Sequence, residues 1–163
     1  STLILRMHLR LMNNINFYHV KNMGIYSTLS KLLEKAIQEG KQSLVRTGSS
    51  TVTDAIDEYL WSYDLSSFLP HSRVGDHEIS SSPIHISNEI DYLNNAQFLF
   101  VVSTDNVDID EILNFKRTFI IFNNDDLNIL KFNRSLWSNL GKRSIERRYW
   151  TQENQRWVHK ELK

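Results

Sequence analysis

Two uninterrupted apolar runs constrain the fold of this chain more than any other feature of its sequence. Residues 98–102 (FLFVV) and 119–122 (FIIF) contain no polar side chain. A strand with one face in water alternates polar and apolar residues, whereas a strand covered on both faces is apolar throughout. We therefore expect both runs to be inner strands of a mainly parallel sheet, with helices packed on both of its faces.

Further strand-like and helix-like segments alternate along the chain. Aromatic and β-branched residues predict strands at 15–20 and 43–46. Apolar spacing predicts helices after Gly24 and at about 51–61, 108–115 and 125–140. Gly40 and Gly141 are expected to end the first and last of these helices. The interpretation is a three-layer α/β/α domain that starts with a βαβ unit.

The remaining segments are less regular. Residues 62–83 contain both prolines and many serines, which predicts a long surface loop. Residues 84–86 (IHI) are too short to assign from their pattern. Residues 148–160 contain two aromatic-rich stretches around a polar turn, so a C-terminal hairpin or edge strand is expected.

Length and composition indicate one compact domain. The chain has 163 residues, of which 40% are hydrophobic, and this is enough for a core. We expect residues 1–11 to be an N-terminal extension and residues 12–163 to form the domain. The apolar stretch within the extension is too short for a signal peptide or a membrane span. Because the chain has no cysteine, disulfides and thiolate metal sites are excluded, and a cytoplasmic location is expected.

Charge is distributed unevenly in a chain that is neutral overall. From residue 131 onward there are nine Lys and Arg against three acids, a net charge of about +6, and the preceding part carries about −6. The C-terminal third therefore offers a basic surface that suits an anionic partner, although a solvated polar face has the same composition.

No motif for nucleotide or metal binding is present. The chain lacks GxxxxGK[ST], GxGxxG and HExxH. His71 and His85 have no second ligand at the spacing typical of metal sites, so each is interpreted as a surface or hydrogen-bonded histidine. No metal and no cofactor are expected.

One acidic cluster is the strongest candidate for catalysis. Asp105, Asp108, Asp110 and Glu111 follow a predicted strand, where α/β enzymes often hold Mg²⁺. Aspartate is also common in turns and at helix N-termini, where it caps free N–H groups, and we favour this second interpretation. Without a G-x-S-x-G elbow or a Ser/His/Asp order, the chain is not expected to be an enzyme.

Two segments resemble a known family. Residues 57–71 (DEYLWSYDLSSFLPH) follow the pattern D-x-x-L-W, a spacer, then S-F-[LV]-P-H, and residues 149–157 (YWTQENQRW) are similar to the ending Y-W-x-Q…W. Together with residues 16–18 (NFY), they make the chain resemble the chi subunit family of bacterial DNA polymerase III, from about residue 12 to 160. The resemblance implies the chi-subunit fold and a non-catalytic accessory subunit of the clamp-loader complex, at the nucleoid-associated replisome in the cytoplasm.

The family captures the acidic C-terminal tail of single-stranded-DNA-binding protein, which ends in a phenylalanine with a free carboxylate. By resemblance, Arg134 and Trp137 occupy the family's Arg and aromatic positions, and Lys131 precedes Arg134 by three residues on the same side of the predicted helix. An Arg fork suits a carboxylate, and an aromatic wall suits a phenyl ring. The family usually has a glycine before the last strand, and this chain has residues 144–148 (SIERR) in its place. Arg147 and Arg148 are added to the tail site as further cations, with a position facing water as the alternative.

A second partner is implied at Trp61, Phe68 and Pro70. Such residues usually pack beneath a loop, but on irregular chain they can also form an exposed apolar patch that binds a partner. The family uses this patch for its psi subunit or for a competing helicase-like repair protein. The chain is expected to be a monomer by itself and to form a heterodimer with psi where psi is present. Its contact with DNA is expected to be indirect.

Two alternatives stay open. Trp150 and Trp157 at the basic end could stack on the bases of single-stranded nucleic acid, although the neutral total charge and the lack of a nucleic-acid motif weigh against this. A Mg²⁺-dependent nuclease or phosphohydrolase would use Asp105, Asp108 and Asp110.

Overall fold

A single eight-stranded sheet organises the chain. The computed structural model describes residues 14–21, 24–63, 69–76, 79–89, 91 and 93–162, so the expected extension at 1–11 lies outside the described residues. The strands are β1 (Asn14–His19), β2 (Ser43–Thr47), β3 (Ser72–Arg73), β4 (Ile84–Ser87), β5 (Phe98–Val102), β6 (Arg117–Phe122), β7 (Arg147–Glu153) and β8 (Arg156–Lys160). The helices are α2 (Ile25–Gln38), α3 (Ser50–Ser62), α4 (Ile109–Ile112) and α5 (Leu127–Lys142), with a short 3-10 turn at Ile79–Ser81.

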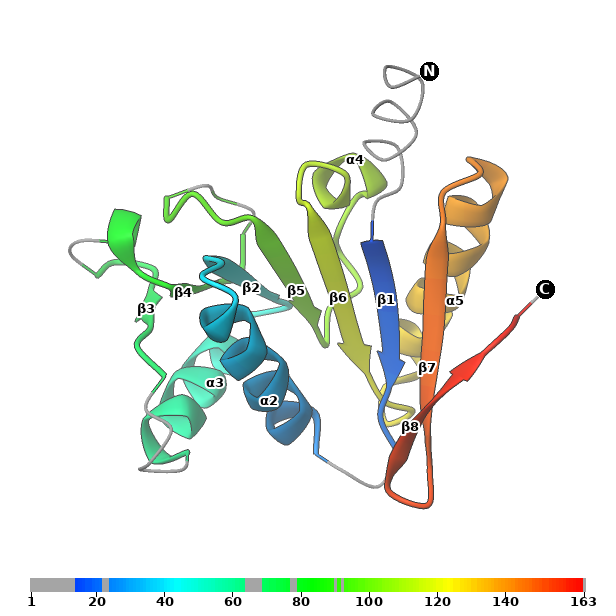
Figure 1. Ribbon diagram of the computed structural model, residues 1–163, viewed down its shortest axis with the longest axis horizontal. Helices are drawn as coiled ribbons and strands as arrows, with labels where there is room; N and C mark the ends of the chain where they lie inside the picture. Colours follow the sequence, from blue (N-terminus) through cyan, green and yellow to red (C-terminus); the bar gives the residue numbers. More distant parts are fainter. Residues whose placement is uncertain are drawn as a thin grey trace.

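The strands follow the order β3-β4-β2-β5-β6-β1-β7-β8 (Figure 1). Every neighbouring pair is parallel except β7 and β8, which form an antiparallel hairpin at one edge. This confirms the mainly parallel sheet and the C-terminal hairpin. Asn154 and Gln155 both adopt positive φ angles at the hairpin tip, as a tight two-residue turn requires.

The expected βαβ unit is present as β1, α2 and β2, but its two strands are not neighbours in the sheet. β1 pairs with β6 and β7, so β5 and β6 lie between β1 and β2. Strand order depends on which apolar edges meet in the folded sheet, and this information is absent from the periodicity of a single segment.

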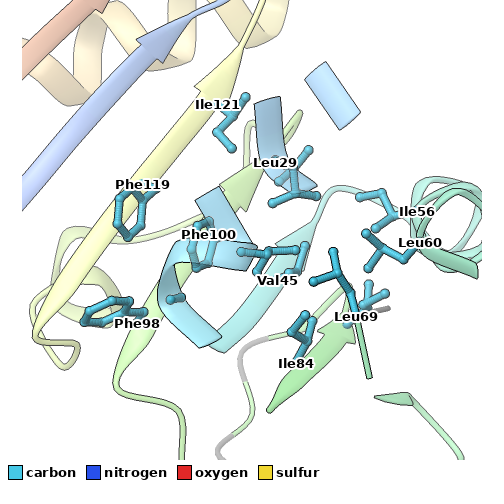
Figure 2. Packing of buried hydrophobic residues seen from close by; sticks show 14 of the residues in the cluster. Leu29, Val45, Ile56, Leu60, Leu69, Ile84, Phe98, Phe100, Phe119 and Ile121 are labelled. Carbon is cyan, nitrogen blue, oxygen red and sulfur yellow. The ribbon is translucent and has the colours of Figure 1, made fainter. Parts of the chain in front are cut away.

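Helices cover both faces of the sheet, as the two apolar runs predict. α2 and α3 lie on one face and α5 lies behind the other (Figure 1). Val45, Phe100 and Ile121 point into the core beneath α2 and α3, part of which is shown in Figure 2. Their neighbours in the chain, such as Leu44 and Leu99, point into a second core beneath α4 and α5. Because successive side chains point to opposite faces of the sheet, these inner strands contribute residues to both cores.

The helix ends differ from expectation at one glycine. Gly40 follows α2 with a φ of 71°, which suits its expected role at the helix end. Gly141 was expected to end α5, but the helix continues to Lys142. A Cβ at Gly141 would lie 2.5 Å from Nη2 of Arg147, so this position lacks a side chain because another one occupies the space. The left-handed residue after the helix is instead Ser144, at φ 57°.

The region expected to be a surface loop is partly strand. Its described part includes β3, and β4 follows with all four residues buried. The Ser72 hydroxyl and Nδ1 of His85 lie 3.0 Å apart, and Nε2 of His85 lies 3.3 Å from Oδ2 of Asp91. β3 pairs in parallel with β4 and forms the edge of the sheet, and the His85 contacts fix the side chain of this residue on the buried strand β4. Among the described helices, none has the length and apolar character needed to cross a bilayer.

Candidate functional site

The C-terminal helix α5 places its basic residues away from the sheet. Asp126 caps its start, since the carboxylate accepts the N–H groups of Asn128 at 2.8 Å and Ile129 at 3.3 Å. The helix buries Leu130, Leu136 and Leu140 against the sheet. Lys131 and Arg134 are consequently exposed.

Trp137 lies where this helix meets the sheet and is held by aromatic neighbours. Its ring meets Phe17 at 5.3 Å and Tyr149 at 5.6 Å between centroids, both edge to face. The Arg147 guanidinium lies 4.1 Å from the centre of the Trp137 ring, and its Nε donates to the Trp137 carbonyl at 2.8 Å. Cation–π and hydrogen-bond contacts thus fix both side chains.

Beside Trp137 is a pocket of about 500 Å³, which we call the α5 pocket. Arg134 is the one charged residue among the described residues that line it. Lys131 does not line the pocket and lies about one turn earlier on the exposed side of the helix. The lining consists of Phe122, Asn133, Arg134, Trp137, Ser138, Tyr149 and Leu162.

A hydrogen-bonded chain supports the aromatic wall of this pocket. The amide oxygen of Asn124 lies 2.6 Å from Nε2 of His19, and the Tyr149 hydroxyl lies 2.6 Å from Nδ1. Because an amide oxygen can only accept, we assign the proton to Nε2, and Nδ1 then accepts from the Tyr149 O–H. In this neutral tautomer both ring nitrogens of His19 are hydrogen-bonded.

The pKa shifts of His19 and Tyr149 agree with this assignment of the protons. Burial lowers the pKa of His19, and the positive charges of Lys21 and Arg134 add to the shift while the hydrogen bond to Asn124 opposes it. Burial raises the pKa of Tyr149 to about 12, although Arg134 opposes this. Near neutral pH His19 and Tyr149 are therefore uncharged, and Arg134 is the charged residue among the described residues that line the pocket.

The two arginines of β7 have different positions. Arg147 lies on the α5 side, where it covers Trp137, and burial lowers its pKa. Strand alternation places Arg148 on the opposite face, together with Trp150. The structure therefore brings together Arg134, Trp137 and Arg147 and leaves Arg148 on the other side of the sheet.

Sequence reasoning did not identify Tyr149, His19 or Leu162 as parts of this site. The alternation of 147 and 149 on one strand face was a usable signal for Tyr149. Leu162 lines the pocket and His19 supports it through the Tyr149 hydroxyl, and only the tertiary structure brings these first and last parts of the described chain together.

The other predicted surface lies near the β3 edge, at the end of α3. Trp61 is 55% exposed and Pro70 is also exposed, whereas Phe68 lies outside the described residues. The Trp61 ring lies 4.7 Å from the His71 ring. His71 is fixed in turn by the Leu69 carbonyl at 2.7 Å and the Asp57 carboxylate at 3.0 Å. The hydrogen-bonded interpretation of His71 is thus correct, and this contact joins the two ends of the 57–71 motif.

Two carboxylates of the acidic cluster, those of Asp110 and Glu111, make structural contacts. The backbone N–H of Asp108 donates to the Glu111 carboxylate at 3.0 Å, and Asp110 pairs with Arg143 at 3.1 Å. Within the described residues, no three His, Asp or Glu side chains come together as a possible set of metal ligands. These contacts support the capping interpretation.

Two comparisons with known proteins indicate the same family. The family described as DNA polymerase III chi subunit, HolC, matches residues 12–158. The probable DNA polymerase III subunit chi of Rickettsia prowazekii (strain Madrid E) is 27% identical over 115 residues. That alignment covers 71% of this chain and 68% of the relative.

Proposed function

This chain belongs to the DNA polymerase III chi subunit family, and we propose that it is a non-catalytic subunit linking the clamp-loader complex to single-stranded-DNA-binding protein. Its work would take place at the bacterial replication fork, in the cytoplasm. The observation that carries the proposal is the α5 pocket, in which one exposed arginine borders an aromatic wall.

The pocket has the chemistry needed for a peptide that ends in phenylalanine. In the proposed complex, Arg134 binds the terminal carboxylate through a charge-assisted pair, and the phenyl ring packs against Trp137 and Tyr149. Leu162 adds an apolar contact at the rim. The net charge of about +6 from residue 131 onward attracts the acidic residues that precede the phenylalanine.

The five residues expected at this site take different roles in the proposal. Arg134 and Trp137 contact the ligand, and Lys131 attracts the acidic segment along the exposed side of α5. Arg147 acts through Trp137, because its guanidinium lies against that ring. Arg148 contributes only long-range attraction, because it lies on the opposite face.

A second surface, formed by Trp61, Phe68 and Pro70, is proposed to bind the psi subunit or a helicase-like repair protein. Its support is the exposure of Trp61 and Pro70, with Trp61 held against the fixed His71 ring. An exposed aromatic side chain on a rigid support is typical of an interface anchor. Phe68→Ala and Arg134→Ala are each expected to lose a different partner in a pull-down from lysate.

The tail site is tested by titrating an acidic peptide that ends in phenylalanine. Micromolar affinity is expected at low salt, weakening as salt rises. Arg134→Ala should weaken binding by about 2 kcal/mol, or roughly 30-fold, because it removes a charge-assisted pair. Trp137→Ala should also weaken it.

Two controls make this titration specific. Lys142→Ala removes an exposed cation at the end of the same helix, outside the pocket, and should change affinity little. A peptide with an amidated C-terminus lacks the carboxylate and should bind wild type and Arg134→Ala equally weakly. Equal affinity of the wild type for the acid and amide peptides would remove the proposed role of Arg134.

A further inference from the structure

A second cleft, of about 570 Å³, lies between α2 and the β7–β8 hairpin. We call it the α2 cleft. It is on the opposite face of the sheet from the α5 pocket, because its wall includes Trp150 whereas the α5 pocket uses Tyr149, the next residue on the same strand. Nothing in the proposed tail site uses this cleft.

Three aromatic rings form one side of the α2 cleft. Tyr18 and Trp150 lie nearly parallel, with centroids 6.3 Å apart and planes 12° apart. Trp157 meets Tyr18 edge to face at 5.1 Å. The indole N–H of Trp150 donates to the side-chain oxygen of Asn16 at 3.0 Å, which fixes its orientation. The rings are therefore held in place before any ligand arrives, and all three are only partly buried.

The opposite side of the cleft is positively charged. Lys31 and Lys35 are one turn apart on α2, line the cleft and are exposed. Neither makes an ion pair with another residue in the described part of the chain. Glu34 also lines the cleft, so the net charge of its lining is positive by one unit. Arg148 lies on the same strand face as Trp150 and adds to this positive field.

We propose that the α2 cleft binds a short segment of single-stranded nucleic acid. The bases would lie against the rings of Tyr18, Trp150 and Trp157, while Lys31 and Lys35 contact phosphates. Aromatic platforms beside a row of cations are the usual means of binding single strands without sequence preference. The chain is neutral overall, but the local charge matches this polyanion. A duplex keeps its bases stacked inside and cannot offer them to the rings.

The test is fluorescence anisotropy of a labelled oligothymidine at low salt. Trp157→Ala should weaken binding at least about fivefold, because stacking on a tryptophan is lost, and Trp157→Phe should recover part of the affinity. The double variant Lys31→Glu, Lys35→Glu tests the charges at two exposed helix positions without touching the core. It should also reduce the salt dependence, because each lost phosphate contact lowers the slope by about 0.7.

A matched control separates local contacts from total charge. Lys116→Glu combined with Lys142→Glu makes the same charge change at exposed positions that do not line the cleft, and should leave binding near the wild-type value. Arg134→Ala should leave oligothymidine binding intact, and the cleft variants should leave tail-peptide binding intact. The two proposals can therefore fail separately.

Three outcomes would overturn the inference. The first is no binding of oligothymidine at low salt. The second is equal weakening by the Lys31/Lys35 and Lys116/Lys142 double variants, which would indicate a general charge effect. The third is displacement of the oligonucleotide by an acidic peptide that itself depends on Trp157, which would make the cleft a peptide site.

Discussion

At the scale of single residues, Tyr149 connects the parts of the α5 pocket. Its ring meets Trp137 at 5.6 Å and Phe17 at 6.3 Å, and its hydroxyl bonds to His19. It therefore joins the first strand, the last parallel strand and α5. The motif Tyr-Trp near the C-terminus sends its first ring to one face of the sheet and its second ring to the other.

The neutral His19 between Tyr149 and Asn124 predicts a pH dependence of stability. A histidine in an unfolded chain has a pKa near 6.5, and burial lowers the pKa of His19 in the folded state. The unfolded state therefore binds the proton more readily, so the stabilising contribution of this neutral site is complete above about pH 6.5. It decreases as the pH falls below that value towards the lowered folded pKa.

Urea unfolding between about pH 5 and pH 8 measures this effect. The wild type should lose more stability toward the acid end than His19→Gln, because glutamine does not titrate. The difference between the two curves isolates His19 from the five other histidines of the chain. Parallel curves would contradict a lowered pKa of His19 in the folded state.

At the scale of elements, the contact between the end of α5 and the start of β7 decides where Trp137 lies. Gly141 leaves room for the Arg147 side chain, which in turn covers the Trp137 ring. The left-handed Ser144 then reverses the chain into β7. The backbone makes this turn with a serine in a conformation that usually favours glycine.

Gly141→Ala tests this contact. Alanine gains at most about 1 kcal/mol over glycine here, because that value applies to a helix interior and Gly141 is the second-last residue of α5. Displacing Arg147 loses a cation–π contact of about 0.5–1 kcal/mol and a hydrogen bond of about 1 kcal/mol. We therefore expect little net change in the free energy of unfolding, but a changed Trp137 fluorescence and weaker tail-peptide binding.

Urea titration and tryptophan emission separate these effects. The Gly141→Ala change should be measured both in the wild type and in the Arg147→Ala variant, which already lacks the cation. A stabilisation of about 1 kcal/mol in Gly141→Ala, with unchanged emission and affinity, would show that the Arg147 contact does not position Trp137.

At the scale of the whole molecule, the proposed sites lie apart on one rigid sheet. Trp61 lies at the end of α3, which covers the sheet towards its β3 edge, and β7 and β8 form the other edge (Figure 1). The α5 pocket and the α2 cleft lie on opposite faces near that other edge, since one is lined by Tyr149 and the other by Trp150. The three proposed ligands would therefore bind at separate positions on the molecule. A subunit that holds several components together requires this arrangement, because binding at one site must not block another.

The two cores give a matched test of this separation. Phe17 and Phe100 are both fully buried, but Phe17 lies under Trp137 in the core beneath α5, whereas Phe100 lies in the core beneath α2 and α3. Each Phe→Leu change should cost about 1–2 kcal/mol of stability. Only Phe17→Leu should also weaken the tail peptide, since it loosens the support of Trp137.

Calorimetric titration of both variants with the peptide, at a temperature where both are folded, provides the measurement. Urea unfolding verifies that their stabilities are comparable. Equal loss of peptide affinity in Phe100→Leu would mean that the pocket responds to global stability and not to its local support.

Much of the architecture is predictable from local pattern. The apolar runs at 98–102 and 119–122 indicated covered parallel strands, and the structure confirms them as β5 and β6 between two helical layers. The polar turn before Trp157 indicated the hairpin, which is confirmed as β7 and β8. These features depend on side-chain periodicity over a few residues, so they can be read along the chain.

Arg134 and Trp137 were chosen from their spacing and from the family resemblance, and their role as ligand contacts stays a prediction. Their assembly with Tyr149, His19 and Leu162 is visible only in the folded molecule. The same holds for the division of Arg147 and Arg148 between two faces, which follows from the register of one strand.

Local periodicity determined most of the strands and helices, because the alternation of apolar side chains acts within each element, whereas the short strands β3 and β4 were decided by pairing across the sheet. The order of the strands, the helical role of Gly141 and the opposed faces of Tyr149 and Trp150 were decided by the tertiary structure. The physical reason is that pairing between distant strands and the space left for a neighbouring side chain are properties of contacts across the chain.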